Sequence, residues 1–266
     1  MTTFVLVGGF WIGAWAWRDV ARRLNMLGHR AFPLTLAGLG ERRAEAADAI
    51  TLETHVNDVS HFLIAGDLHD VVLVGHSGAG AIVNAVAARE GRRLTELVFV
   101  DSGPVPEGRA IADFGGPTGR ADTIAKAVDG RIPLPSWKEI GEASLAGLDE
   151  ANRSFFRALA VPQPLRVAVD PVRLGGVVPR TLRKRAILCT IPADAVRALI
   201  AEGNPWFAPM GGAEWTPRQL DTGHWPMLSE PLKLADTLAE GHVLSRPANV
   251  AGLDWRTRRR RLAMAV

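Results

Sequence analysis

A ten-residue stretch, Val71–Gly80, constrains the fold of this chain more than any other. It reads Val-Val-Leu-Val-Gly-His-Ser-Gly-Ala-Gly and continues as an alanine-rich run to Ala88. The four apolar residues, three of them β-branched, predict a strand buried on both faces, and the alanine-rich run predicts a helix. Ser77 stands at the turn between the two elements. Its small neighbours allow the backbone to close tightly and leave room for a substrate carbonyl to approach the hydroxyl.

Strand and helix patterns alternate along most of the chain, which predicts an α/β fold with a mostly parallel sheet of about six strands flanked by helices. The expected strands are residues 4–7, 31–36, 71–74, 97–100, 185–190 and 215–220, and the expected helices include 15–27, 52–65, 194–202 and 232–244.

The alternation of strand and helix patterns stops between Ser102 and Arg185, where the sequence is rich in proline and carries only short helical patterns. So long a stretch without a clear sheet strand is unusual for a loop in a compact domain. We interpret residues 103–184 as a helical cap inserted into a core made of residues 1–102 and 185–244. Residues 245–266 form a basic C-terminal tail.

Four segments together resemble the α/β-hydrolase superfamily, in particular the branch of plant methyl esterases, hydroxynitrile lyases and related bacterial esterases. The opening segment is similar to the pattern L-V-H-G-x-x-x-G-A-W-x-W of that branch, and the Ser77 turn is similar to its nucleophile elbow. The four segments are Phe4–Trp17, Leu36–Arg42, Val71–Gly80 and Asp221–Glu230.

The resemblance implies a Ser-His-Asp triad, because a serine hydroxyl needs a base within hydrogen-bond reach and a carboxylate to orient that base. Ser77 is the expected nucleophile and His224, after the last strand, the expected base. The superfamily's order of serine, acid and histidine favours Asp194 as the acid, with Asp101 as the alternative. Asp221 lies too close to His224 in sequence to orient its ring.

The same resemblance implies an oxyanion hole made by the backbone amides of Phe10 and Gly78. Trp11, Trp225 and Met227 adjoin these catalytic loops, and we expect them to line an apolar substrate pocket. His76 is expected to be structural. No metal and no cofactor is expected.

Two departures from the branch bear on function. The family's His-Gly dipeptide is Gly8-Gly9 in this chain, which removes a side chain that braces the oxyanion loop. Lyase members carry a lysine directly after the catalytic histidine, whereas this chain has Trp225, so cyanohydrin cleavage is not expected. The expected activity is hydrolysis of a carboxylic ester or lactone of a small apolar or aromatic molecule. A lyase or cyclase of secondary metabolism, and a non-catalytic small-molecule binder, are the alternatives.

The composition of the chain indicates its expected cellular location. The single cysteine, Cys189, excludes an internal disulfide and favours a cytoplasmic location. Residues 3–17 are apolar but lack a preceding Lys or Arg, so we interpret them as a first strand and not as a signal peptide. No stretch is apolar for long enough to suggest a membrane span.

Charge is concentrated at one end of the chain. The formal charge of the whole chain is +3. Residues 245–266 hold six arginines and one aspartate, a net charge of +5, so the remaining residues carry a net charge of −2. We interpret this tail as solvated and expect a small-molecule substrate as the partner. Neither a nucleic acid nor a stable membrane association is expected, and homodimer formation stays open.

Overall fold

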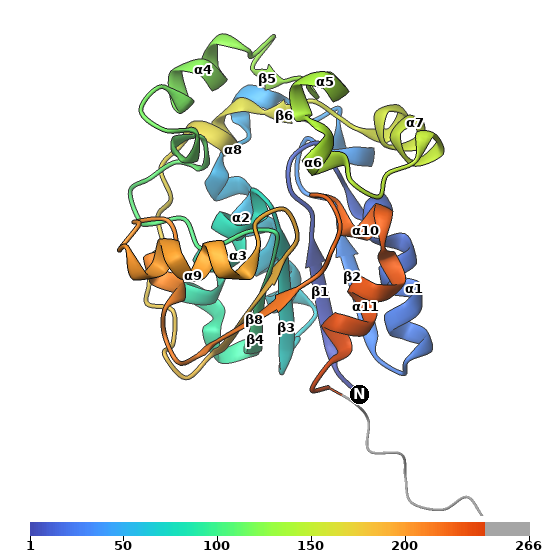
Figure 1. Cartoon of the computed structure of the whole chain (residues 1–266), viewed down its shortest axis with the longest axis vertical. Helices are drawn as coiled ribbons and strands as arrows, with labels where there is room; N and C mark the ends of the chain where they lie inside the picture. Colours follow the sequence, from blue (N-terminus) through green and yellow to red (C-terminus); the bar gives the residue numbers. More distant parts are fainter. Residues whose placement is uncertain (243–266) are drawn as a thin grey trace, which may run out of the picture.

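The structure is a computed structural model that describes residues 1–242. Six parallel strands form one sheet in the order β2-β1-β3-β4-β7-β8, with helices packed on both sides of it (Figure 1). This confirms the predicted fold class. The strands of the sheet are β1 (Thr3–Val7), β2 (Arg30–Leu34), β3 (Val71–His76), β4 (Leu94–Val100), β7 (Arg183–Leu188) and β8 (Trp215–Gln219).

The central strands alternate their side chains between two apolar layers, as the period of a strand requires. Val5 and Val7 of β1 belong to the core cluster that includes α2 and α3, whereas Phe4 and Leu6 belong to the cluster that includes α1 and α11. β3 is buried along its whole length. The helices beside the sheet are α1 (Arg18–Met26), α2 (Leu52–Ala65), α3 (Ala79–Glu90), α9 (Ala193–Ala201), α10 (Pro226–Ser229) and α11 (Pro231–Ala239).

Several predicted boundaries differ from the structure for local reasons. The helix expected at 15–27 begins with one 3₁₀ turn, Ala14–Trp17, before α1. The last expected helix, 232–244, corresponds to α11, which begins at Pro231 and ends at Ala239, and the short helix α10 before it was not predicted. Strand β7 starts at Arg183, two residues before the predicted edge of the cap. Proline at the first turn is compatible with a helix start, since it lacks only an amide that the helix does not use.

Residues 103–182, which we call the cap segment, connect β4 to β7. Its helices and short strands lie over the end of the sheet where the strands finish, and the chain after α8 runs back to the start of β7 (Figure 1). Most of its regular elements are short helices, but it also contains a two-stranded antiparallel ribbon of β5 and β6 that the sequence did not indicate. Its elements are a 3₁₀ turn (Ile111–Gly115), α4 (Gly119–Ala125), β5 (Arg131–Ile132), α5 (Trp137–Ile140), α6 (Glu142–Leu145), α7 (Glu150–Leu159), β6 (Gln163–Pro164) and α8 (Leu165–Val169).

A buried charged cluster ties the last helix to the sheet. Glu96 of β4 receives two hydrogen bonds from Arg185 of β7, at 3.0 and 2.7 Å, and one from His242 at 2.6 Å. The Arg185 guanidinium also donates to the backbone carbonyl of Thr237 in α11. Buried charges are stable only when they are paired and hydrogen-bonded, so this cluster fixes α11 against the sheet.

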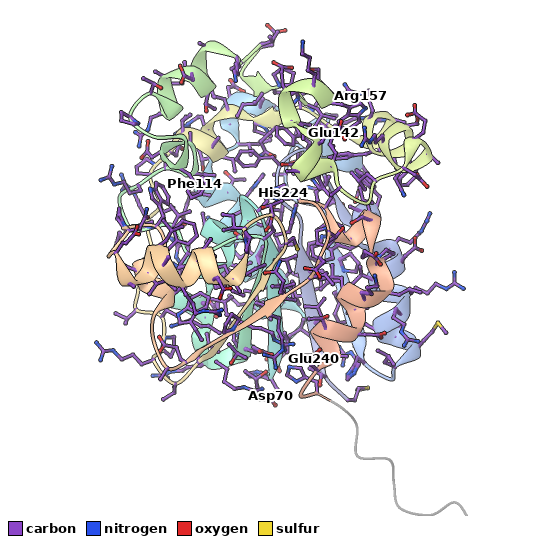
Figure 2. All side chains as sticks on the ribbon, viewed as in Figure 1. Asp70, Phe114, Glu142, Arg157, His224 and Glu240 are labelled. Atoms are coloured by element: carbon purple, nitrogen blue, oxygen red, sulfur yellow. The ribbon has the colours of Figure 1, made fainter. Side chains whose placement is uncertain are left out.

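The two ends of the sheet therefore differ in character. Figure 2 shows His224 beneath the cap segment, with Asp70 and Glu240 at the opposite end.

Between residues 1 and 242, no helix has the length and apolar character that crossing a bilayer requires. The predicted basic tail, 245–266, lies outside the described residues. A cytoplasmic location and the oligomeric state stay predictions.

Candidate active site

Ser77 occupies the sharp turn between β3 and α3. Its φ of 52° lies in the left-handed region, which a non-glycine residue rarely adopts. The turn is held by hydrogen bonds from the Ser77 amide to the Val100 carbonyl (3.1 Å) and from the Gly80 amide to the Ser77 carbonyl (2.9 Å). Strain of this kind persists only where the surroundings fix it, and here it raises the serine side chain above the end of the sheet.

Close packing around the turn explains two of its glycines. A Cβ atom on Gly78 would lie 2.7 Å from the ring of Phe10, and one on Gly9 would lie 2.8 Å from the Cβ of Ser77. The loop after β1 and the turn at Ser77 therefore pack directly against each other, because Gly9 and Gly78 have no side chains. Any larger residue at 9 or 78 would separate the two segments that carry the predicted oxyanion amides.

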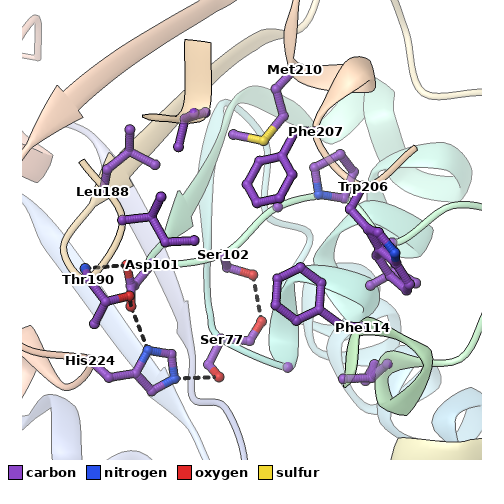
Figure 3. Close-up of a pocket in the computed structure, with 17 residues that line it drawn as sticks. Ser77, Asp101, Ser102, Phe114, Leu188, Thr190, Trp206, Phe207, Met210 and His224 are labelled. Atoms are coloured by element: carbon purple, nitrogen blue, oxygen red, sulfur yellow. Dashed lines mark hydrogen bonds and ion pairs between the residues drawn. The ribbon is translucent and has the colours of Figure 1, made fainter. Parts of the chain in front are cut away.

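His224 links the serine to a carboxylate. The loop between β8 and α10 presents its ring so that Nε2 lies 2.8 Å from Ser77 Oγ and Nδ1 lies 2.6 Å from Asp101 Oδ2 (Figure 3). Since a carboxylate can only accept, Nδ1 carries the proton and Nε2 is free to accept the serine proton. The His224 amide also donates to the carbonyl of Ser144 in the cap segment, which fixes the loop from above.

Asp101 is the carboxylate that orients the ring. It directly follows β4, its side chain is only 5% exposed, and its Oδ1 accepts from the amides of Cys189 and Thr190 at 2.9 Å each. The Thr190 hydroxyl donates to Oδ2 at 2.7 Å. Burial by itself would raise the pKa of Asp101, but the hydrogen bonds from His224 and Thr190 outweigh it and lower that pKa well below 3.8. The carboxylate therefore stays charged.

The preference for Asp194 as the acid is wrong in this structure. Asp194 lies in the first turn of α9, its side chain is 90% exposed, and it pairs with Arg197 one turn later. The chain follows the order serine, acid, histidine, but the acid beside His224 comes from β4 and not from β7. Thr190, which sequence reasoning missed, stands after β7 and donates to that acid.

His76 is buried and joins two of the loops. Its Nδ1 accepts from the Gly9 amide at 3.4 Å, so its Nε2 carries the proton and donates to the His224 carbonyl at 2.7 Å. Burial, reinforced by the neighbouring His224, lowers the pKa of His76 well below its ordinary value. The ring is therefore neutral and serves as a brace, in the structural position that the sequence predicted.

The predicted oxyanion amides lie on two segments in contact. The Phe10 ring packs on Gly78, and Gly78 itself lines the cavity beside Ser77. Among residues 1–242, neither the Phe10 amide nor the Gly78 amide donates to another protein group. Their part in catalysis stays a prediction.

A cavity of about 340 Å³ opens next to Ser77 and His224. Figure 3 shows Phe114, Trp206, Phe207 and Met210 on the side away from His224. The Phe114 ring meets the Trp206 ring edge to face, with centroids 5.4 Å apart. Among the described residues of the lining, the only acidic or basic side chains are Asp101 and His224, which are hydrogen-bonded to each other. The lining residues are Ser77, Gly78, Asp101, Ser102, Gly103, Pro104, Val105, Ile111, Phe114, Leu188, Thr190, Ile191, Val196, Trp206, Phe207, Met210 and His224.

The predicted pocket residues do not line this cavity. Trp225 and Met227 are 3% and 1% exposed and belong to the core under α5–α7, where the Trp225 ring contacts Phe156. Trp11 packs against the same core and bonds to the cap segment. Adjacency in sequence to the catalytic loops did not place these side chains in the cavity, because α5–α7 fill the space above them.

Comparison with known proteins places the chain in a family. A profile described as "Alpha/beta hydrolase family" matches residues 4–237. The chain belongs to the alpha/beta hydrolase family. It is 30% identical over 248 residues to a carbendazim hydrolyzing esterase of Nocardioides sp. (strain SG-4G), covering 90% of this chain and 99% of that protein. It is also 33% identical over 99 residues to an esterase of Oryza sativa subsp. japonica, covering 36% of this chain and 37% of that protein.

Solved structures of this family show the same fold. An extracellular alpha/beta-hydrolase from a Paenibacillus species superposes with a TM-score of 0.74 at 21% identity, over 90% of this chain and 98% of the other. A methylesterase from Arabidopsis gives 0.66 at 18% identity, over 91% and 99%. The family match over residues 4–237 and the esterase relative confirm the suspected family and the assignment as a hydrolase enzyme.

Proposed function

We propose that this hydrolase cleaves carboxylic esters through a covalent acyl-enzyme. The observation that carries the proposal is the row of hydrogen bonds that joins Ser77 to His224 and His224 to Asp101. The serine at one end of this row lines the open cavity. Nucleophile, base and orienting acid are each within the reach that proton transfer requires. The esterase relatives support the same reaction class.

In the first half of the reaction, Ser77 Oγ attacks the ester carbonyl while Nε2 of His224 takes its proton. The carboxylate of Asp101 stabilises the ring as it becomes positively charged. The amides of Phe10 and Gly78 hold the negative oxygen of the tetrahedral intermediate. His224 then gives the proton to the departing alcohol oxygen, and the acyl group stays on Ser77.

In the second half, a water molecule attacks the acyl group while His224 again accepts a proton. The second tetrahedral intermediate collapses, the proton returns to Ser77 Oγ, and the carboxylic acid leaves. Each group therefore ends the cycle in the state in which it began.

The lining of the cavity supports a neutral substrate with an apolar or aromatic body. Phe114, Trp206 and Phe207 present ring surfaces for stacking, and the described lining offers no free charge to pair with an ionised substituent. The relatives described as a carbendazim hydrolyzing esterase and as a methylesterase support ester hydrolysis. A charged group would lose its hydration without gaining a partner.

A fluorophosphonate probe tests the mechanism. We expect stoichiometric labelling of the wild type, none of Ser77→Ala, and retained labelling of Ser102→Ala, the other serine of the cavity. Peptide mapping after digestion identifies the labelled residue. Folded wild-type protein that takes up no label would refute the proposal and would favour a non-catalytic binder.

A pair of p-nitrophenyl esters tests the substrate class. We expect kcat/KM for p-nitrophenyl benzoate to exceed that for the p-nitrophenyl monoester of succinic acid by at least about tenfold, because the latter brings a carboxylate into the cavity. Equal rates for the two esters would remove the argument from the lining while leaving the labelling result intact.

A further inference from the structure

The residue after Phe10 has an unusual backbone. Trp11 has a φ of 68°, in the left-handed region, although it is neither glycine nor asparagine. Such a conformation is held only where neighbouring contacts fix it. The Trp11 amide belongs to the peptide that joins Phe10 to Trp11, so contacts that hold Trp11 fix the chain on one side of Phe10.

Three hydrogen bonds to the cap segment hold Trp11. Its amide donates to Gln163 Oε1 at 3.3 Å, its carbonyl accepts from the Val161 amide at 2.9 Å, and its indole Nε1 donates to the Ile132 carbonyl at 3.0 Å. On the other side of Phe10, the Gly9 amide is held by His76. Phe10 therefore lies between two fixed points.

Gln163 is the one side chain among these three cap partners, because Val161 and Ile132 contribute only backbone atoms. It is 1% exposed, and its Nε2 has no hydrogen-bond partner among the described residues. Burying an unpaired amide nitrogen is unfavourable, so a methionine of similar size would suit this position better if packing were all that mattered. The bond from the Trp11 amide to Oε1 is what a methionine cannot replace.

We propose that Gln163 is a positioning residue for the oxyanion hole, and that it acts through Trp11 to aim the Phe10 amide at the reacting oxygen. The proposal rests on the esterase function above. It makes the β5–β6 ribbon of the cap segment part of the catalytic scaffold and not only a cover for the substrate. Position 8 is a glycine whose Cβ would lie 2.8 Å from Ile12, so no side chain of residue 8 supports this loop.

The ribbon has another attachment that provides a matched control. Arg131 of β5 donates to the carbonyls of Gly38, Arg43 and Glu45, which lie in the loop after β2 and not in the oxyanion loop. Arg131→Lys keeps the charge but cannot reach all of these carbonyls, so it loosens the ribbon without removing the bond to Trp11.

The test compares Gln163→Met, Gln163→Glu and Arg131→Lys with two inhibitors of one aryl skeleton. A trifluoromethyl ketone adds to the serine and places an oxyanion in the hole, whereas the corresponding methyl ketone binds without forming that adduct to a useful extent. We expect Gln163→Met to reduce kcat/KM and the affinity for the trifluoromethyl ketone together, by about 10- to 100-fold. Affinity for the methyl ketone should stay within about twofold.

The conservative variant sharpens the result. In Gln163→Glu, the buried carboxyl in its protonated form still offers a carbonyl oxygen to the Trp11 amide, so this variant should recover at least part of the lost activity. Arg131→Lys should lower the melting temperature while leaving the ratio of the two inhibitor affinities unchanged. If Gln163→Met does not fold, Trp11→Phe, which removes the bond to Ile132, is expected to show the same pattern with a smaller loss.

Three results would overturn the proposal: wild-type kcat/KM in Gln163→Met, equal losses of affinity for both ketones, or an equal change in inhibitor ratio in Arg131→Lys. These outcomes are separate from a failure of the proposed function. In that case the wild type itself takes up no fluorophosphonate and shows no preference for the trifluoromethyl ketone.

Discussion

The segments that follow β4 and β7 lie side by side at the same end of the sheet, and each carries an aspartate. Asp101 of the β4 loop is 5% exposed and receives hydrogen bonds from two backbone amides, a hydroxyl and His224. Asp194, in the first turn of α9 after β7, is 90% exposed and contacts a surface arginine. The comparison shows that the partners turned toward a carboxylate, and not its place in the order of strands, decide which aspartate is suited to orient the histidine.

The largest expected effect comes from the two aspartates themselves. Asp101→Asn should reduce kcat by about 10⁴-fold, because an amide at this position allows the wrong tautomer of His224 and removes the charge that stabilises the protonated ring. Steady-state kinetics with a p-nitrophenyl ester measures the loss. Asp194→Asn is the matched control and should keep kcat within about twofold, since exposed ion pairs contribute little. A larger loss in Asp194→Asn than in Asp101→Asn would reverse the comparison.

The second prediction concerns Thr190, through which the β7 loop acts on the β4 acid. Thr190→Val removes the hydroxyl bond to Asp101 while keeping the shape of the side chain and the backbone bond. Hydrogen bonds to charged groups contribute about 1.5–3 kcal/mol, so we expect kcat to fall by roughly 10- to 100-fold. Thr190→Ser retains the hydroxyl and should restore most of the activity. Equal kcat values in the valine and serine variants would show that this hydroxyl does not support the acid.

The third prediction separates chemistry from binding. The β7 loop contributes Ile191 to the cavity wall. Ile191→Ala should raise KM for p-nitrophenyl benzoate by about 5- to 10-fold with kcat nearly unchanged, because it removes apolar contact from the bound state and the transition state alike. A fall in kcat with constant KM would instead assign this residue to the chemistry.

The smallest expected effect is on stability in acid. The pKa of Asp101 is lowered in the folded protein, since burial, which would raise it, is outweighed by the hydrogen bonds from His224 and Thr190. A carboxyl with a lowered folded pKa stabilises the protein above its unfolded pKa of about 4, and this contribution is lost as pH falls through the folded pKa.

The free energy of unfolding of the wild type should therefore exceed that of Asp101→Asn by an amount on the order of 1–3 kcal/mol at about pH 6. The difference should shrink as pH falls from about 4 toward 2. Urea titrations followed by tryptophan fluorescence measure both curves. The curve of Asp194→Asn should follow that of the wild type, and a difference that stays constant with pH would contradict the argument.

The strand, turn and helix around Ser77 could be predicted because their signals are local. An apolar β-branched run, a serine between small residues and an alanine-rich segment each restrict the chain over a few residues. The place of His224 followed from the same logic, as the loop between the last strand and the last helix. Neither prediction needed knowledge of which distant segments touch.

The acid and the cavity wall could not be predicted in the same way. Asp101 depends on the amides of Cys189 and Thr190, some 88 residues away, being turned toward it. Trp206 and Phe207 follow α9, which in the view of Figure 1 runs across the direction of the strands, and no local pattern indicates that orientation. Trp225 is large, apolar and adjacent to the catalytic base, yet the cap helices bury it in the core.

The charged cluster of Glu96, Arg185 and His242 has a practical consequence for engineering. It anchors the last described helix at the end of the sheet opposite to the candidate active site. A protein domain fused after residue 242 would therefore be attached far from the cavity. A shortened chain that lost His242 would remove one of the three hydrogen bonds to the buried Glu96 carboxylate and leave only those from Arg185. A fusion partner should therefore be attached after His242, and the chain should not be truncated before this residue.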